Sequence, residues 1–377
     1  MIVSAVRTPL GRRGKGLSQI HPATLLGTVQ RAALEVAGVD PASVGQVIGG
    51  CVAQVGEQSF NVTRTAWLAE GLPESVAAST VDAQCGSSQQ ALTLAAALVG
   101  AGVVDLALAC GVESMSRLPI GSNFRKDLGL GRPVPKDYLR RYEFLNQYQA
   151  AERIAEKWGV TREQADALGL SSQQRAAAAW ADGRFDGQIV PVTDPEGTVL
   201  SRDEGLRDTS AEALAALGAV VPNGVHTAGS ASQISDGASA VLVASERRAA
   251  ELNLRPLARI VDTATVGVDP VMMLLGPHEV TPTLLARNAL GIDDVDLVEI
   301  NEAFASVVLS WAADSHVDPE RVNPNGGAIA LGHPLGGSGC VLTTKAVHEL
   351  QRSGGRYGLV TMCCGGGLGT GTLLERL

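Results

Sequence analysis

Short runs of β-branched and other apolar residues alternate with Ala-rich stretches of helical period along the chain. This alternation is typical of α/β proteins, in which helices cover a sheet. A helix is predicted over 87–99. The apolar runs predict three strands near the start and three near the end of the chain: 44–50, 78–82, 104–109, 295–300, 328–331 and 357–362.

Residues with reactive side chains follow these runs at similar spacings in the two halves. Cys85 comes 34 residues after Cys51, and His333 comes 32 residues after Asn301. Self-similar spacing indicates duplication. We therefore predict two duplicated α/β halves.

A region of different character separates the halves. Residues 118–145 are irregular and charged, and 150–181 are helical with Thr161 as a helix N-cap. Residues 190–230 consist of short polar stretches. Long excursions between core elements commonly form lids or binding surfaces. The predicted domains are a first half at 1–117, an inserted loop domain with the return to the first half at 118–245, and a second half at 246–377.

Composition narrows the class of protein. The chain has 377 residues, 45% of them hydrophobic, and a net charge of −9. The apolar fraction excludes disorder, and the acidic balance argues against a nucleic-acid-binding protein, which needs a basic face. The one stretch of membrane length, 91–112, is interrupted by Gly100, Gly102 and Asp105, so we expect no membrane span.

Three further features of the sequence argue against a metal site, a secretory signal and a nucleotide site. The six cysteines form no C-x-x-C pair, so we expect no metal site, and reduced thiols in a cytoplasmic protein. The start of the chain reads as a strand rather than a secretory signal. Neither a G-x-x-x-x-G-K-[ST] loop nor a G-x-G-x-x-G turn is present, which argues against ATP and dinucleotide sites.

Cys85 lies in the segment VDAQCGSSQQ (81–90), between a predicted strand and a predicted helix. A helix N-terminus favours thiolate over thiol, so we expect a lowered pKa and a nucleophile at this position. The alternative is a small buried apolar residue.

His333 lies in the glycine-rich segment NGGAIALGHPLGGSG (325–339). Its position between glycines suits proton transfer or oxyanion donation, and the alternative is a structural histidine bound by backbone carbonyls. Asn301 ends an apolar strand, and taken alone it reads as a helix N-cap.

The segment TMCCGGG (361–367) offers a second thiol and exposed backbone N–H groups, which can form an oxyanion hole. In an extended chain Cys363 and Cys364 face opposite sides. We expect Cys363 to be the functional thiol of the pair.

These elements, in this order, resemble the thiolase family (acyl-CoA C-acyltransferases): the Cys85 loop, NEAF at 301–304, GHP at 332–334 and Cys363-x-Gly365. The resemblance covers essentially the whole chain. It implies two βαβαβαββ halves in a five-layered αβαβα arrangement, with a loop domain inserted in the first half.

The resemblance also implies roles for these residues. Cys85 would be the nucleophile that is acylated, and His333 would take its proton. Cys363 would exchange a proton with the acetyl-CoA enolate. Asn301 would hold a water that forms one oxyanion hole with His333, and the N–H groups of Cys85 and Gly365 would form the other.

Coenzyme A would be a co-substrate, with no permanently bound cofactor. By resemblance, Ser232 lies near the pantetheine amide, Arg207 beside the adenine and Phe304 beside the pantetheine, and Met273 opens the MLLGP segment that replaces the family's MGTGP. Ser230 and Gln233 replace a usual Asn and Gly. The expected assembly is a homodimer or homotetramer.

Residues 146–152 bear on which acyl group the protein accepts. Their sequence is NQYQAAE, where short-chain acetoacetyl-type thiolases have H-M-G-x-T-A-E. The missing His–Met pair favours a medium, long or bulky acyl group cleaved in β-oxidation. Segments 82–90 and 232–237 resemble actinobacterial thiolases of steroid and fatty-acid degradation. The alternatives are a biosynthetic acetyl-CoA acetyltransferase, a 3-oxoacyl synthase of the same superfamily and a non-catalytic acyl-CoA- or lipid-binding relative.

Overall fold

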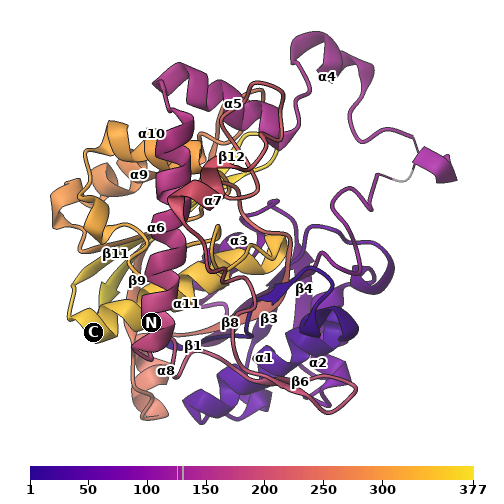
Figure 1. Ribbon diagram of the computed structural model, residues 1–377. Coiled ribbons are helices and arrows are strands. Elements are labelled where there is room, and N and C mark those ends of the chain that lie inside the picture. The colour runs from indigo at the N-terminus through magenta and orange to yellow at the C-terminus, as the bar shows by residue number, and fades with distance from the viewer. Residues whose placement is uncertain (125, 130) are drawn as a thin grey trace.

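The computed structural model describes residues 1–124, 126–129 and 131–377 (Figure 1). Its strands are β1 (Ile2–Arg7), β2 (Gly11–Arg12), β3 (Gln46–Gly50), β4 (Ala77–Val81), β5 (Leu106–Ser114), β6 (Val192–Thr193), β7 (Val199–Leu200), β8 (Ser235–Ala244), β9 (Ala258–Gly267), β10 (Leu297–Ile300), β11 (Tyr357–Cys364) and β12 (Leu368–Arg376). Its α-helices are α1 (Pro22–Ala37), α2 (Val62–Ala69), α3 (Ser87–Gly100), α4 (Lys136–Arg141), α5 (Gln147–Trp158), α6 (Arg162–Ala181), α7 (Ala211–Ala215), α8 (Glu246–Glu251), α9 (Gly276–Arg287), α10 (Ala305–Ser315) and α11 (Ser338–Ser353).

The sheet consists of two half-sheets with the same internal plan. The first runs β4-β3-β5-β8-β1 and the second β10-β11-β12-β9, and they meet through the single residue pair Ile2–Ala258. In the first half β3 and β5 are parallel, and β8 is antiparallel to both β5 and β1. The second half repeats this with β10, β11, β12 and β9. The predicted duplication is therefore confirmed.

The strand predicted at 328–331 is wrong. This segment forms a turn in which Ala330 N and Leu331 N both donate to Gly327 O. The counterpart of β4 in the second half is reduced to one parallel bridge between Val298 and Val322. The other five predicted strands exist, with shifted ends.

Helices divide the molecule into five layers. Helices α1 and α2 pack on the outer side of the first half-sheet, and α9 with α10 on that of the second. Helices α3 and α11 are buried between the half-sheets and contact each other, with Gly339 placed against the backbone of Gln89 where a Cβ has no room. The αβαβα arrangement is thus confirmed. Cys85 and His333 precede these two central helices.

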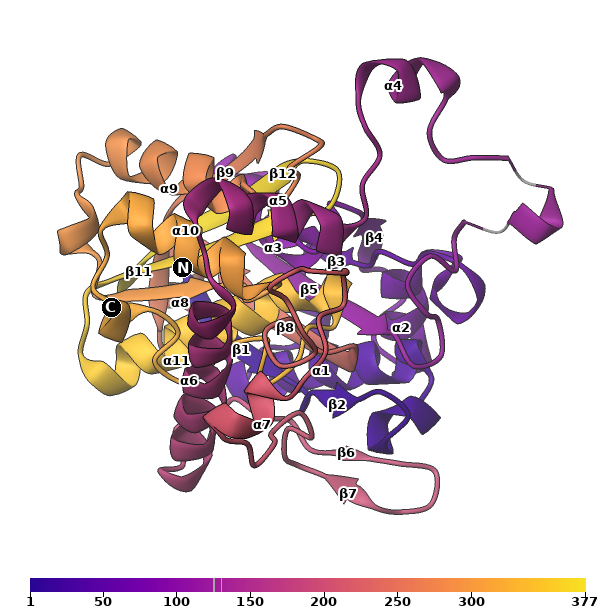
Figure 2. The same ribbon diagram turned by 45° about the horizontal axis from the view of Figure 1, so that its top comes forward.

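The inserted region covers one end of the molecule. Helices α5 and α6 contact α10, while the segment that carries α4 stands away from the body in both views, and the β6–β7 hairpin extends from another side (Figures 1 and 2). Thr161 caps α6 as predicted, accepting from Gln164 N. The domain boundaries at 117/118 and 245/246 remain predictions. In the described ranges, no helix is long and apolar enough to cross a bilayer.

A buried ion pair fastens the inserted region to β1. Arg7 and Asp203 are both fully buried at their side chains and form two hydrogen bonds of 2.7 and 3.0 Å. Asp203 also accepts from Leu10 N and from Trp180 Nε1.

We expect Asp203→Ala to destabilise the protein by about 3–5 kcal/mol, because it leaves the Arg7 charge buried and unpaired. The midpoint of urea denaturation measures this loss. Asp182→Ala removes the half-exposed partner of Arg184 and is the control, with an expected effect below about 1 kcal/mol. Equal shifts in the two variants would contradict the anchoring role of Asp203.

Candidate active site

Cys85 is presented by a tight turn between β4 and α3. Gln84 adopts a left-handed conformation with φ +53°, and its N–H donates to Asp82 Oδ1 at 2.7 Å. Gly86 is the N-cap of α3, and a Cβ there would lie 2.6 Å from Thr370 Oγ1 and 2.7 Å from Cys364 Sγ. The turn is held against the second half-sheet, so both halves fix the position of the thiol.

Two backbone N–H groups, those of Cys85 and Gly365, are directed at the Cys85 sulfur. They are the pair expected to form an oxyanion hole. The expectation of a lowered thiol pKa is wrong: burial raises the pKa of Cys85 to about 11, and the charges of Glu113 and Asp82 raise it further against the two N–H groups. Cys85 therefore rests as a thiol and needs a base to become a nucleophile.

His333 is held in one tautomer by Ser338. The Ser338 hydroxyl donates to Pro334 O at 2.8 Å, so its oxygen accepts from the Nδ1–H of His333 at 2.6 Å. His333 Nε2 then carries the lone pair, and burial lowers the pKa of the ring to about 4. The imidazole is thus neutral and able to accept a proton at Nε2. The predicted alternative of binding by backbone carbonyls does not hold for Nδ1.

Ser338 is a positioning residue, and Ser338→Ala should slow acylation of Cys85 about tenfold to a hundredfold. The buried Nδ1–H loses its acceptor, which costs about 1–3 kcal/mol, while the KM for acyl-CoA stays near the wild-type value. Single-turnover acylation measures the rate. Ser310→Ala, at a buried hydroxyl that bonds within α10, is the control. An unchanged acylation rate in Ser338→Ala would contradict this role.

Asn301 contacts His333 directly, with its Nδ2 3.4 Å from His333 Nε2. Its reading as a helix N-cap is wrong, since α10 begins at Ala305 with Phe304 at the N-cap. The backbone N–H of Asn301 instead bonds to Thr361 O of β11. The end of β10 thus places the amide beside the histidine.

Glu302 was not among the residues predicted for the site. Its carboxylate is buried and accepts from Ser172 Oγ at 2.6 Å, Ile329 N at 3.1 Å and Asn323 Nδ2 at 3.0 Å. These bonds shape the turn that leads to His333. The same contacts explain why 328–331 is not a strand. Its position just after an apolar strand, where an acidic side chain needs partners, could have marked Glu302 in the sequence.

Cys363 and Cys364 face opposite sides of β11, as predicted. Cys363 packs in an apolar cluster with Phe304 and Met273, whereas Cys364 lies near Thr370 in the core between the half-sheets. Burial raises the pKa of Cys363 well above its ordinary value, and the charge of Cys85 raises it further. The thiol of Cys85 is thus near enough to Cys363 to act on it electrostatically.

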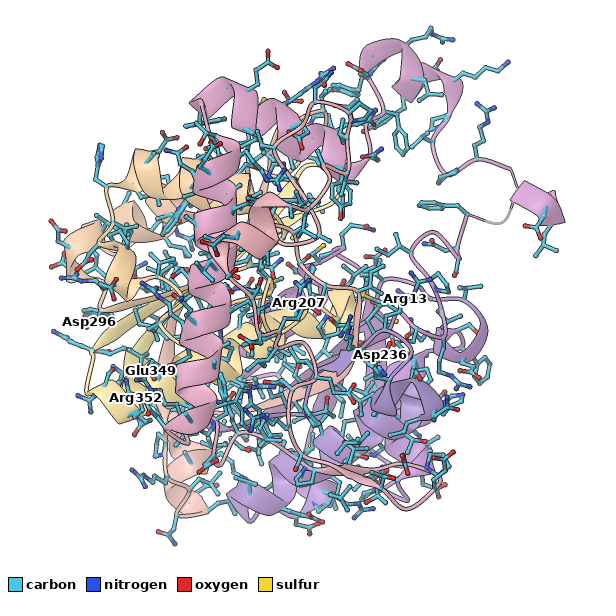
Figure 3. All side chains as sticks on the ribbon, viewed as in Figure 1. Arg13, Arg207, Asp236, Asp296, Glu349 and Arg352 are labelled. Atoms are coloured by element: carbon cyan, nitrogen blue, oxygen red, sulfur yellow. The ribbon has the colours of Figure 1, made fainter. Side chains whose placement is uncertain are left out.

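The residues predicted to contact coenzyme A lie in the inserted region and around α10. Arg207, labelled in Figure 3, donates to Ala228 O at 3.3 Å and is half-buried. Ser232 is half-buried next to Phe304, since its N–H bonds to Ala303 O. Gln233, which replaces the family's Gly, donates to the carbonyls of residues 205, 329 and 330 at 2.8–3.0 Å. This substitution therefore ties the inserted region to the His333 segment.

A cleft opens over Cys85, which we call the acyl cleft. Gln84, Glu113, Phe124 and Gln147 line it together with Leu335, two residues after His333. Glu113 was missed at the sequence level, although it is an acidic residue inside an apolar run. It accepts from Val52 N, Ala53 N, Gly336 N and Gln58 Nε2, and so joins the floor of the cleft to the start of α11.

The structure therefore brings the predicted residues together in two contacting groups. Cys85, Gly365 and Cys363 form one, and Asn301 with His333 forms the other. Leu335, two residues after His333, lines the acyl cleft together with Cys85. Arg207 lies in the inserted region, where it donates to Ala228 O.

Comparison with known proteins identifies the family of the chain. Residues 1–247 match the model of the thiolase N-terminal domain, and residues 254–376 match that of the thiolase C-terminal domain. A steroid 3-ketoacyl-CoA thiolase of Mycobacterium tuberculosis is 47% identical over 382 residues, which cover 100% of this chain and 94% of the relative. A beta-ketoadipyl-CoA thiolase of Acinetobacter baylyi is 43% identical over 398 residues, which cover 100% of this chain and 99% of the relative.

A solved structure shows the same fold. The acetyl-CoA acetyltransferase of Bacillus anthracis superposes with a TM-score of 0.92 at 37% identity, covering 100% of this chain and 98% of that one. Both domain models, the full-length relatives and the fold indicate the same family. The chain belongs to the thiolase family.

Proposed function

We propose that this protein is a 3-oxoacyl-CoA thiolase, an acyl-CoA C-acyltransferase that uses coenzyme A to cleave 3-oxoacyl-CoA into acetyl-CoA and a shortened acyl-CoA. One observation carries the proposal. A buried thiol, Cys85, lies under two converging N–H groups and beside a second thiol, Cys363. Cleavage of a carbon–carbon bond needs a nucleophile, an oxyanion hole and a proton donor for the departing enolate, and this group supplies all three.

In the first half-reaction, His333 Nε2 takes the proton of Cys85, and the Cys85 sulfur attacks carbon 3 of the substrate. The N–H groups of Cys85 and Gly365 stabilise the oxyanion on that carbon. The bond between carbons 2 and 3 breaks. The acetyl-CoA enolate, held by His333 and a water on Asn301, takes a proton from Cys363. Acyl-Cys85, protonated His333 and the Cys363 thiolate remain.

In the second half-reaction, the Cys363 thiolate takes the proton of coenzyme A. The coenzyme A thiolate attacks acyl-Cys85, and protonated His333 returns its proton to the Cys85 thiolate that leaves. All groups regain their starting protonation states. Because acyl-Cys85 persists between the two substrates, ping-pong kinetics follow.

We propose that the physiological direction is degradative and that the acyl group is medium, long or bulky. The NQYQAAE segment at 146–152 supports this, since it departs from that of acetoacetyl-type thiolases. The 47% identity to a steroid 3-ketoacyl-CoA thiolase also favours a degradative role. Biosynthetic acetyl transfer from acetyl-CoA is the second candidate, since the site would catalyse both directions.

Coenzyme A is proposed to bind as a co-substrate along Arg207, Ser232, Phe304 and Met273. Burial lowers the pKa of Arg207, and the charge of Arg12 lowers it further, so a second guanidinium lies in the surroundings of this one, which suits the phosphates of coenzyme A. Phe304 and Met273 belong to the apolar cluster around Cys363, which suits the neutral pantetheine arm. No cofactor is proposed to remain bound between turnovers.

We propose a homodimer or homotetramer. Strand β4, which precedes Cys85, ends the sheet and pairs on one side among the described residues, and Phe60 next to it is 94% exposed. A free edge beside an exposed aromatic favours pairing with a second copy. Light scattering that gives a monomeric mass would overturn this.

We also propose a cytoplasmic location, which suits six free cysteines.

The test of the proposed function is incubation of the protein with 3-oxooctanoyl-CoA and coenzyme A. Mass spectrometry should find acetyl-CoA and hexanoyl-CoA in equal amounts, with parallel double-reciprocal plots for the two substrates. Binding of acyl-CoA without either product would support the non-catalytic alternative. Products formed only from acetyl-CoA, in the condensing direction, would support the biosynthetic one.

A further inference from the structure

We infer that the acyl cleft selects an acyl chain with an uncharged hydrogen-bonding oxygen, a hydroxyl above all, close to the reacting ketone, and that it rejects a chain that ends in a carboxylate. This inference rests on the proposed function and goes on to name a substrate class. It is carried by two glutamine amides beside the oxyanion hole and by the charges around them.

Both amides stand next to Gly365. A Cβ built on Gly365 would lie 3.3 Å from Gln84 Oε1 and 3.6 Å from Gln147 Nε2. The N–H of Gly365 is directed at the Cys85 sulfur, where the ketone carbon of the substrate is to be held. An acceptor and a donor therefore border the cleft within a few bonds of that carbon.

The structure fixes which atom of Gln84 faces the cleft. Its Nε2 lies 3.3 Å from each carboxylate oxygen of Asp82, which leaves Oε1 toward Gly365. Gln147 is the first residue of α5 and half-buried, and the described residues provide its amide with no hydrogen-bond partner. A substrate group can thus reach one fixed acceptor and one unoccupied donor.

A hydroxyl is the neutral group that complements both, because it donates to Gln84 Oε1 and accepts from Gln147 Nε2. A ketone pairs with Gln147 alone. A plain alkyl chain leaves both amides unpaired and desolvated, which costs binding energy. The cleft therefore favours an oxygenated chain over an alkyl chain.

The charges around the cleft exclude an anionic chain. Burial raises the pKa of Glu113, which lines the cleft, so the negative charge beside the amides comes from the exposed carboxylate of Asp82, directly behind Gln84. A carboxylate on the acyl chain would meet the like charge of Asp82 and the acceptor Oε1 of Gln84. Met115, Leu118, Ile120 and Phe124 also line the cleft, which suits apolar carbon beyond the hydroxyl.

The experiment compares thiolysis of three substrates by wild-type protein: 3-oxooctanoyl-CoA, 5-hydroxy-3-oxooctanoyl-CoA and 3-oxoadipyl-CoA. The hydroxylated chain should have a kcat/KM about fivefold to tenfold above that of the alkyl chain. A factor of this size is what the net contribution of one neutral hydrogen-bonded group to binding gives. The 3-oxoadipyl chain should be the poorest, by about tenfold or more. Gln147→Met keeps the side-chain volume without the amide and should bring the hydroxyl-to-alkyl ratio close to one.

Gln19→Met, at an exposed glutamine in the short helix Gly16–Gln19, is the matched control and should keep the wild-type ratio. Equal kcat/KM for the alkyl and hydroxylated chains, the same ratio in Gln147→Met as in the control, or 3-oxoadipyl-CoA as the best substrate would each overturn the inference. Acetylation of Cys85 by acetyl-CoA is measured on the same samples. If Cys85 is acetylated and selectivity fails, the inference alone falls; if Cys85 is never acetylated, the proposed function falls with it.

Discussion

Cys85→Ala is expected to lower the rate of thiolysis by at least about 10⁴-fold. Without the sulfur no acyl-enzyme can form, and water or coenzyme A would have to attack the ketone directly in a buried site. The variant should still bind acyl-CoA, because the contacts proposed for coenzyme A lie in the inserted region and around α10. Thiolysis and equilibrium binding are measured on the same preparation.

The matched control for this variant is Cys110→Ala. Cys110 is equally buried, but it lies on β5 and bonds to Gln30. It should keep activity within a few-fold of wild type, corrected for folded protein. Thiolysis by Cys85→Ala at a rate near that of the control would contradict covalent catalysis through Cys85.

Cys363→Ala is expected to separate the two chemical roles of the site. Acylation of Cys85 should persist, since its nucleophile, base and oxyanion hole remain. Exchange of the α-protons of acetyl-CoA with D₂O should fall about 10²- to 10⁴-fold, the usual contribution of a positioned acid or base. Overall thiolysis should fall with it, because the enolate loses its proton donor.

Cys364→Ala is the neighbouring control. Its side chain points away from Cys363, into the core near Thr370. Proton exchange should continue in this variant. If Cys363→Ala exchanges α-protons as fast as Cys364→Ala, Cys363 is not the group that moves the proton.

The chemical residues could be found from the sequence because each lies in a short segment with its own pattern. Cys85 follows a strand and precedes a helix, His333 lies among glycines, and three glycines follow the Cys363–Cys364 pair. The similar spacings in the two halves also predicted the duplication. These features are local, so one chain is enough to reveal them.

The errors arose where distant contacts decide the outcome. The apolar run 328–331 is a turn because Glu302, far away in sequence, accepts from Ile329 N. The pKa of Cys85 is raised because burial between two half-sheets outweighs two N–H groups, and burial depends on the whole fold.

Two residues went unnoticed for the same reason. Ser338 fixes the tautomer of His333 from five residues away, and only the geometry shows that its proton is already committed to Pro334 O. Glu113 joins β5 to the start of α11 by a bond to Gly336 N, a contact across more than two hundred residues. Ser338 lies in the glycine-rich segment 325–339, in which His333 alone was predicted to be chemical, and Glu113 lies in no segment that a pattern marks as chemical.

The most direct test of covalent acyl transfer is peptide-mapped mass spectrometry of wild-type protein after brief incubation with acetyl-CoA. Acetyl-CoA is the probe because a thiolase accepts it at the nucleophile whatever its longer substrate. We predict an acetyl group on Cys85, absent from Cys363 and Cys364, that free coenzyme A removes. An unmodified Cys85 in protein that demonstrably binds coenzyme A would contradict the account.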